Sequence, residues 1–111
     1  MDKYNIIITP NAENQIKEIV NYISTILLNT DAARKFVIFL KEKIGKLNIF
    51  PEAYPILDRK PWNKKEIRKL LIKSFIVYFY VNKEKYIIYI LAVVYGKRDQ
   101  LKQLELLDFN D

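Results

Sequence analysis

Apolar residues recur at helical spacing in a segment near the start of the chain. The residues of this stripe are Ile16, Ile19, Val20, Ile23 and Leu27. Thr9 and Pro10 precede it, and a threonine N-cap followed by proline is a frequent helix start, because the first helical position needs no N–H donor. Residues 4–9 form a short β-branched run. The pattern therefore predicts a strand that leads directly into an amphipathic helix.

A second helical stripe follows after a short polar interruption. Its apolar residues are Phe36, Val37, Leu40, Ile44 and Leu47. Residues 29–31 (Asn-Thr-Asp) can cap this helix at its start, and Pro51 limits it at its end. Two amphipathic helices joined by about three residues form an antiparallel hairpin, and each needs a surface to cover its stripe.

The C-terminal half has the pattern of three strands, at residues 66–72, 75–81 and 86–95. Before them, the three prolines of residues 50–63 exclude a helix and a central strand, so this stretch is expected to be a loop. If residues 82–85 form a four-residue turn, one face of the last two strands is wholly apolar. The pairs on that face are Phe79 with Ile88, Val77 with Ile90 and Phe75 with Ala92. We expect the helix hairpin to pack there.

The opposite face of the same register is aromatic and aliphatic rather than charged. It pairs Tyr80 with Ile87, Tyr78 with Tyr89 and Ile76 with Leu91. Such a surface, which has hydroxyl groups on an apolar background, is typical of a binding face. Residues 99–107 have apolar residues at helical spacing after an aspartate, which predicts a short C-terminal helix.

Length and composition predict one domain over residues 1–111. The chain is 50% hydrophobic and contains no cysteine and no histidine. Thiol nucleophiles, disulfides, serine–histidine triads and nearly every zinc site are thereby excluded, and we expect no metal and no cofactor. No apolar run reaches the roughly 18 residues of a spanning helix, and no signal pattern begins the chain, so we expect a cytoplasmic protein without membrane association.

Positive charge is concentrated in one part of the chain. The net charge is +6, but residues 59–98 contain 11 of the 19 basic residues and only two acids, which gives +9 there. Such asymmetry favours contact with a polyanion, either nucleic acid or an acidic protein segment. A solvated lysine-rich surface is the alternative interpretation.

The order of these elements resembles that of the RelE/ParE superfamily of bacterial toxin–antitoxin modules. The resemblance depends on the opening residues 4–10 leading to Ala12 and Ile16, on residues 47–51 closing the hairpin, on the strand at 75–81, and on the terminal residues 94–99. It implies an α+β fold: an N-terminal strand, an antiparallel helix hairpin packed on one face of a mainly antiparallel sheet, and a short C-terminal helix.

The resemblance implies a toxin that a cognate acidic antitoxin neutralises, in a homodimer or in a hetero-oligomer with the antitoxin. ParE-like members inhibit DNA gyrase, and this is the favoured function. RelE-like members cut mRNA in the ribosome, without a metal, and are the alternative. A non-toxic module that binds single-stranded nucleic acid is a further alternative, from a different functional class.

By resemblance, Arg98 matches the arginine that stabilises the transition state in the nuclease branch, with Lys69 or Arg68 as the remaining catalytic candidate. The nuclease's strand-three arginine and C-terminal tyrosine fall on Ile76 and near Leu104, which favours the gyrase branch. Candidate residues for contacting a substrate or partner are basic or aromatic. They are Lys64, Lys65, Lys73, Tyr78, Tyr80, Tyr89 and Lys97.

Overall fold

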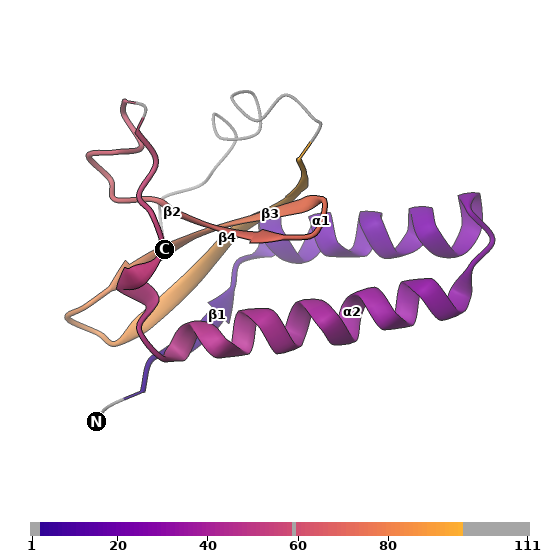
Figure 1. The fold of residues 1–111 in the computed structure, drawn as a ribbon, viewed down its shortest axis with the longest axis horizontal. Coiled ribbons are helices and arrows are strands. Elements are labelled where there is room, and N and C mark those ends of the chain that lie inside the picture. The colour runs from indigo at the N-terminus through magenta and orange to yellow at the C-terminus, as the bar shows by residue number, and fades with distance from the viewer. Residues whose placement is uncertain (1–2, 59, 97–111) are drawn as a thin grey trace.

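The computed structural model describes residues 3–58 and 60–96, and within them two helices cover one face of a four-stranded sheet (Figure 1). The helices are α1 (Pro10–Asn21) and α2 (Thr30–Gly45). The strands are β1 (Asn5–Ile8), β2 (Arg68–Ile72), β3 (Phe75–Asn82) and β4 (Ile87–Tyr95). The predicted helix at residues 99–107 lies outside the described residues.

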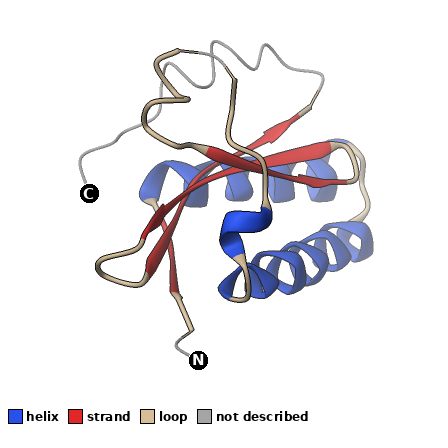
Figure 2. Cartoon of the chain, turned by 60° about the vertical axis from the view of Figure 1, so that its left-hand side comes forward, coloured by secondary structure: helices blue, strands red, loops and turns tan. Residues whose placement is uncertain are grey.

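The sheet has the strand order β1-β4-β3-β2. The β2–β3 and β3–β4 pairs are antiparallel, whereas β1 pairs with β4 in parallel. The helices connect β1 to the meander and lie together on one side of the sheet, while the long loop before β2 lies on the other side (Figure 2). This mixed, mainly antiparallel α+β arrangement confirms the fold class that the sequence predicts.

Both helices begin where their capping residues predict. Thr9 is the N-cap of α1, and its hydroxyl oxygen accepts a hydrogen bond from the Ala12 N–H at 3.3 Å. Asn29 caps α2, and its side-chain oxygen accepts from the Ala32 N–H at 3.0 Å. The Thr9 hydroxyl also donates to the Ile90 carbonyl at 2.7 Å, so the same residue ends β1, starts α1 and anchors that junction to β4.

The helical stripes and one sheet face form the main core. Its buried residues come from both helices, the turn after α2, and strands β2, β3 and β4. They are Ala12, Leu40, Ile44, Leu47, Leu70, Ile72, Val77, Phe79, Val81, Ile88, Ile90 and Val93. At the start of β3, Phe75 meets Phe36 of α2, with ring centroids 4.9 Å apart. The helix hairpin therefore packs on the predicted face.

The register of the β3–β4 hairpin differs from the predicted one. Asn82 pairs with Ile87, and Phe79 pairs with Ile90 instead of Ile88. Because a shift of two residues preserves the alternation of a strand, the predicted faces survive this error. A β-bulge between the pairs of Tyr78 and Phe79 then places both Leu91 and Ala92 on the second face, so the prediction of Ala92 beneath the helices was wrong.

The second face of the sheet is covered by the loop before β2. Its buried cluster includes Trp62 and Ile67 from this loop with Ile76, Tyr78, Tyr89, Leu91, Ala92 and Val94 from the sheet. The loop contains a short 3-10 turn, Pro51–Ala53, and β2 begins at Arg68 rather than at residue 66. Glu66 has φ 55°, a left-handed conformation that a strand cannot include. The sheet therefore has a buried cluster on each face.

We predict that Thr9→Ala lowers the free energy of unfolding by about 1–2 kcal/mol, because α1 loses its cap and the β1–α1 junction loses its bond to Ile90. The control is Thr25→Ala, whose hydroxyl donates to the Asn21 carbonyl on an exposed helical surface and whose loss is expected to cost less than about 0.5 kcal/mol. Urea unfolding of both variants measures the difference. Equal midpoints would contradict the role given to Thr9.

Candidate functional site

The two basic candidates at the start of β2 lie on opposite faces of the sheet. Strand alternation places Arg68 with the buried Leu70 and Ile72, on the helix side, and directs Lys69 to the second face. Lys69 pairs across the strands with Tyr78 and is half-buried. The two residues therefore cannot act at one site.

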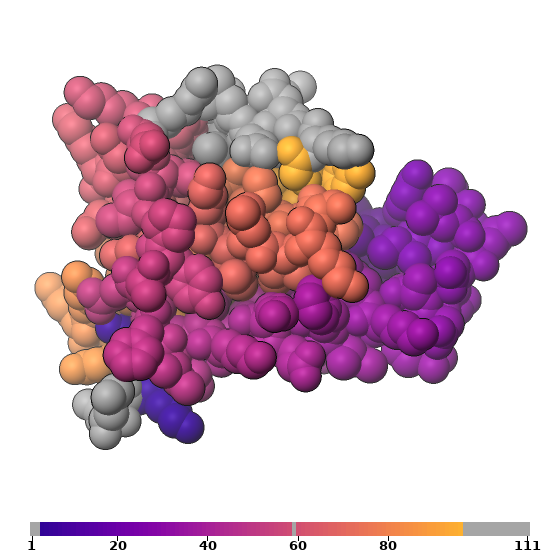
Figure 3. All heavy atoms as spheres, viewed as in Figure 1, coloured from indigo at the N-terminus to yellow at the C-terminus, as the bar shows by residue number. Residues whose placement is uncertain are grey.

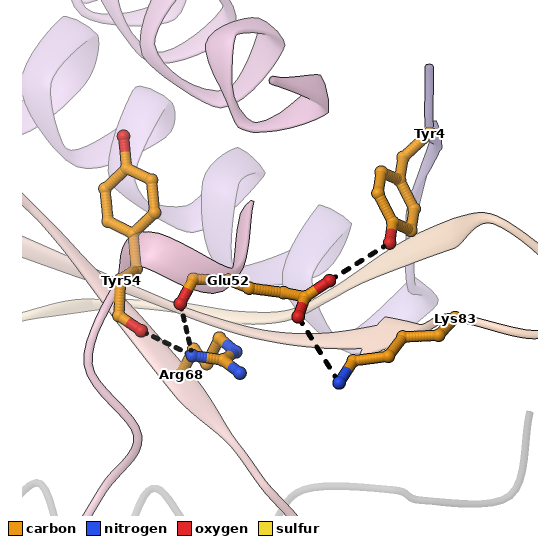
Figure 4. A network of polar contacts seen from close by, with 5 residues as sticks. All are labelled: Tyr4, Glu52, Tyr54, Arg68 and Lys83. Carbon is orange, nitrogen blue, oxygen red and sulfur yellow. Dashed lines mark hydrogen bonds and ion pairs between the residues drawn. The ribbon is translucent and has the colours of Figure 1, made fainter. Parts of the chain in front are cut away.

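Arg68 is buried, with 8% of its surface exposed, and it holds the loop onto the sheet. Its guanidinium donates to the main-chain carbonyls of Glu52 at 3.0 Å and Tyr54 at 2.7 Å (Figure 4). These carbonyls lie in the 3-10 turn Pro51–Ala53 and in the residue that follows it, and burial without a donor would cost each of them free energy. The geometry gives Arg68 a structural position rather than a place at a substrate.

Glu52 extends this network to two further segments. Its carboxylate accepts a hydrogen bond from the Tyr4 hydroxyl at 3.4 Å and pairs with the Lys83 ammonium at 3.3 Å (Figure 4). Desolvation, and then the charge of Glu52, raise the pKa of the Tyr4 phenol above its ordinary value. The N-terminal segment, the 3-10 turn and the β3–β4 turn are thus joined at one edge of the molecule.

The tyrosines of the second face differ in accessibility. Tyr78 is 1% exposed, and burial raises the pKa of its phenol, which therefore stays protonated at neutral pH. Tyr89 is also buried, in the same cluster as Trp62, and the half-buried Tyr80 packs against that cluster. The hydroxyl-bearing binding face expected from the sequence is largely covered by the loop.

The other basic candidates are dispersed. Lys64 and Lys65 are exposed in the turn that precedes β2. Lys73 lies in the β2–β3 turn on the helix side, with its ammonium 4.6 Å from the centre of the Phe39 ring. Lys97 and Arg98 lie outside the described residues. The described candidates are therefore distributed over both faces, and no three Asp or Glu side chains among residues 3–58 and 60–96 gather to hold a metal ion.

A concave feature of the described surface lies elsewhere, at the end of the sheet where β4 finishes. A groove of about 690 Å³ separates the C-terminal half of α1 and the turn after it from the end of the sheet. Ten residues line it: Gln15, Glu18, Ile19, Tyr22, Ile23, Leu27, Phe75, Val93, Val94 and Tyr95. Sequence reasoning missed this groove.

The sequence contains a sign of this groove, the apolar run at residues 26–28, but the helical pattern assigns Leu27 to the core. Leu27 was placed in the buried stripe of the first helix, yet it is 56% exposed. It belongs to an apolar run, residues 26–28, that is too long for one helical stripe, because consecutive residues point in different directions around a helix. A run of exposed large apolar side chains of this kind is typical of an interaction surface.

A family model matches residues 6–100 of the chain. It describes the ParE toxin of the type II toxin–antitoxin system parDE. The chain belongs to this toxin family. The match covers α1, α2, β2, β3 and β4, all of β1 except Asn5, and the basic region, so the protein is the toxin component of a type II toxin–antitoxin system. A search of curated protein sequences gives no significant match.

Solved structures of toxins from such systems have the same fold. The chromosomal ParDE system of P. aeruginosa gives a TM-score of 0.70 at 18% identity, over 86% of this chain and 98% of that one. The RelBE2 toxin–antitoxin complex of Mycobacterium tuberculosis gives 0.61 at 14% identity, over 86% and 93%. A mutant of the E. coli toxin RelE in the free state gives 0.59 at 16% identity, over 92% and 93%.

We predict that Arg68→Ala lowers the free energy of unfolding of this ParE-family toxin by about 2–3 kcal/mol, because two carbonyls lose a charged donor. Lys69→Ala, at the neighbouring position on the other face, is expected to change it by less than about 0.5 kcal/mol. Denaturant unfolding measures both. If Arg68→Ala kept full stability but lost toxicity, Arg68 would belong to the functional site after all.

Proposed function

We propose that this toxin stops growth by binding DNA gyrase in the cytoplasm, and that it acts as an inhibitor rather than as an enzyme. The observation that supports this most directly is the ParE family match over residues 6–100. The resemblance found in the sequence implies gyrase inhibition for ParE-like toxins and mRNA cleavage for RelE-like toxins. In the described part of the chain, no helix combines the length and hydropathy needed to cross a membrane.

The dispersed candidate residues favour a binder over a ribonuclease. Metal-independent cleavage of RNA needs several cationic groups directed at one phosphate, together with an acid and a base. Here Arg68 donates to backbone carbonyls, Lys73 lies against Phe39 on the helix side, and the buried Tyr78 phenol has a raised pKa. Of the two catalytic candidates within the described residues, Lys69 alone lies on the second face, and one lysine does not provide these groups.

Neutralisation by a cognate antitoxin follows from membership of a toxin–antitoxin family. The ParDE and RelBE2 structures with this fold are toxin–antitoxin systems, which supports such a partner for this chain. The positive charge of residues 59–98 suits an acidic antitoxin segment. Exposed lysines in the turns, such as Lys64 and Lys85, would steer the encounter electrostatically.

Two assays on the purified toxin test the proposed target. We expect inhibition of supercoiling by purified gyrase, and no cleavage of mRNA when translating ribosomes are supplied. Addition of the antitoxin should restore supercoiling, which controls for nonspecific inhibition by a basic protein. Cleavage of mRNA without any effect on supercoiling would replace the gyrase proposal with the nuclease alternative.

We further predict that Arg98→Ala weakens gyrase inhibition by about tenfold or more, as loss of a central charged contact commonly does. Arg98 lies outside the described residues, and its choice depends on the family resemblance alone. Lys85→Ala, in the exposed β3–β4 turn, is the matched loss of one positive charge. Lys83 is a poorer control because it pairs with Glu52. Equal inhibition by both variants would remove Arg98 from the site.

A further inference from the structure

β1 is an edge strand of the sheet. It pairs with β4 on one side, and in the described part of the chain no strand lies on its other side. The N–H groups of Asn5 and Thr9 donate to carbonyls in and just before β4, at 2.9 and 3.0 Å, so these residues direct their backbone groups toward β4. Because the directions alternate along a strand, Ile6 and Ile8 direct theirs away from the sheet. The outer edge of β1 therefore presents two N–H groups and two carbonyls.

The sequence features that usually protect an edge strand are missing from β1. Edge strands are commonly protected by a charged residue, a proline or a bulge. Residues 5–8 have the sequence Asn-Ile-Ile-Ile, and they pair with β4 in consecutive register. They belong to a longer uncharged stretch, residues 4–12, which lies between Lys3 and Glu13. The Ile7 side chain is 43% exposed. An apolar, uncharged edge of this kind favours pairing with a further strand.

Both ends of β1 are held in place, so the strand is ordered before any partner binds. Just before its start, the Tyr4 ring lies 5.4 Å from the Tyr86 ring, and the Tyr4 hydroxyl donates to the Glu52 carboxylate. Figure 3 shows this N-terminal segment in indigo at the lower left, near the orange atoms of the β3–β4 turn. After its end, the Thr9 hydroxyl is bonded to the Ile90 carbonyl. An ordered strand loses little conformational entropy when a partner pairs with it.

We propose that a second copy of this chain pairs with the outer edge of β1, in an antiparallel dimer whose twofold axis passes beside Ile7. In this register Ile6 of each copy lies opposite Ile8 of the other. Two opposite residues whose backbone groups face each other exchange two hydrogen bonds, so every outward group of Ile6 and Ile8 is used. Pro10, which would lie opposite Tyr4, has no N–H and ends the ladder.

The distribution of charge favours a second copy at this edge. The chain carries a net charge of +6, so two copies repel each other unless they meet at an uncharged surface. An acidic partner is attracted to the basic residues 59–98, whereas residues 4–12 offer it no cation. Two identical edges satisfy each other's backbone groups, as a twofold interface requires. Ile6 packs on the main core, so alternation places Ile7 on the other face, where the two Ile7 side chains meet across the axis.

The dimer is expected to be reversible. A stable interface buries roughly 800 Å² on each partner, and a strand of this length offers less. Sedimentation equilibrium of the full-length toxin should therefore show a monomer–dimer equilibrium that shifts with protein concentration. Because salt screens the repulsion between two basic chains, the dimer fraction should rise with ionic strength, whereas charge-steered binding of an acidic partner weakens. A toxin that remains monomeric at millimolar concentration in high salt would overturn the proposal.

Disulfide trapping tests the register, because the chain has no cysteine of its own. In Ile7→Cys the two cysteines form a pair without mutual hydrogen bonds, whose Cα atoms lie about 4.5 Å apart, within the range that a disulfide bridges. Ile8→Cys is the register control, since it lies opposite Ile6, and Ile38→Cys, on the exposed surface of α2, controls for random collision. On mild oxidation we expect Ile7→Cys to give about tenfold more covalent dimer than either control. Equal yields on non-reducing electrophoresis would overturn the proposal.

Hydrogen exchange of the unsubstituted toxin, followed by NMR, identifies what occupies the edge. We expect the Ile6 and Ile8 amides to exchange freely in dilute toxin and to become protected as its concentration rises, whereas the Ile7 amide, which faces β4, is protected throughout. Protection of Ile6 and Ile8 in the monomer would mean that another part of this chain covers the edge, and would overturn the proposal. Protection that appears only with the purified product of the adjacent gene would assign the edge to the antitoxin, and would overturn it as well.

Self-association of the free toxin does not depend on the proposed gyrase target, so each inference can fail without the other. Thermal unfolding of the reduced cysteine variants at low concentration checks that each is folded. We expect their midpoints to lie close to that of the wild type, because all three substituted side chains are partly exposed. The exchange experiment uses no substitution, so it decides the question even if a variant is unstable.

Discussion

The central β3–β4 hairpin is apolar on both faces, and this is the constraint on which the rest of the structure depends. From Ile88 to Val94 every residue of β4 is buried. A strand of this kind is stable only where each face of the sheet is covered, because exposed apolar surface costs free energy roughly in proportion to its area. The helix hairpin covers one face, and the loop with Trp62 covers the other.

This double cover limits where function can occur. A simple three-stranded meander would leave the second face as an open aromatic surface. In the structure, the loop before β2 covers much of that face. Arg68 helps to hold the start of the loop, since it donates to the carbonyls of Glu52 and Tyr54, and backbone bonds such as Leu57 N–H to the Ile67 carbonyl hold the rest. A basic residue beside a tyrosine-rich strand can therefore anchor a loop to the sheet instead of contacting a substrate.

The sequence predicted the parts of the fold that local physics determines. Thr9 and Asn29 cap their helices as expected, because a cap needs only the residues next to it. The faces of β3 and β4 were also predicted, since an error of two residues in register preserves alternation. The apolar pattern does not reveal the bulge that moves Ala92 to the second face, because Leu91 and its neighbours are all apolar.

The candidate site was predicted less well, because its geometry depends on contacts between distant segments. The contact of Arg68 with Glu52 spans 16 residues, and no spacing rule connects them. The groove depends on a difference in length between two paired strands that lie about 80 residues apart in the chain, as the bond from Thr9 to Ile90 shows. Neither strand alone reveals that difference.

The junction of Thr9 and Pro10 that starts α1 also determines where β1 ends. Pro10 has no N–H to donate to a strand partner, and the Thr9 hydroxyl is already bonded to the Ile90 carbonyl, so β1 cannot continue beside the rest of β4. A longer β1 would displace the start of α1 from its cap. Exposed strand edges are a liability that proteins usually cover, charge or shorten. Here the N-terminal part of β4 is covered by β1, and side chains of α1 bond the edge beyond it: Asn11 donates to the Leu91 carbonyl at 2.9 Å, and Gln15 accepts from the Val93 N–H at 2.8 Å.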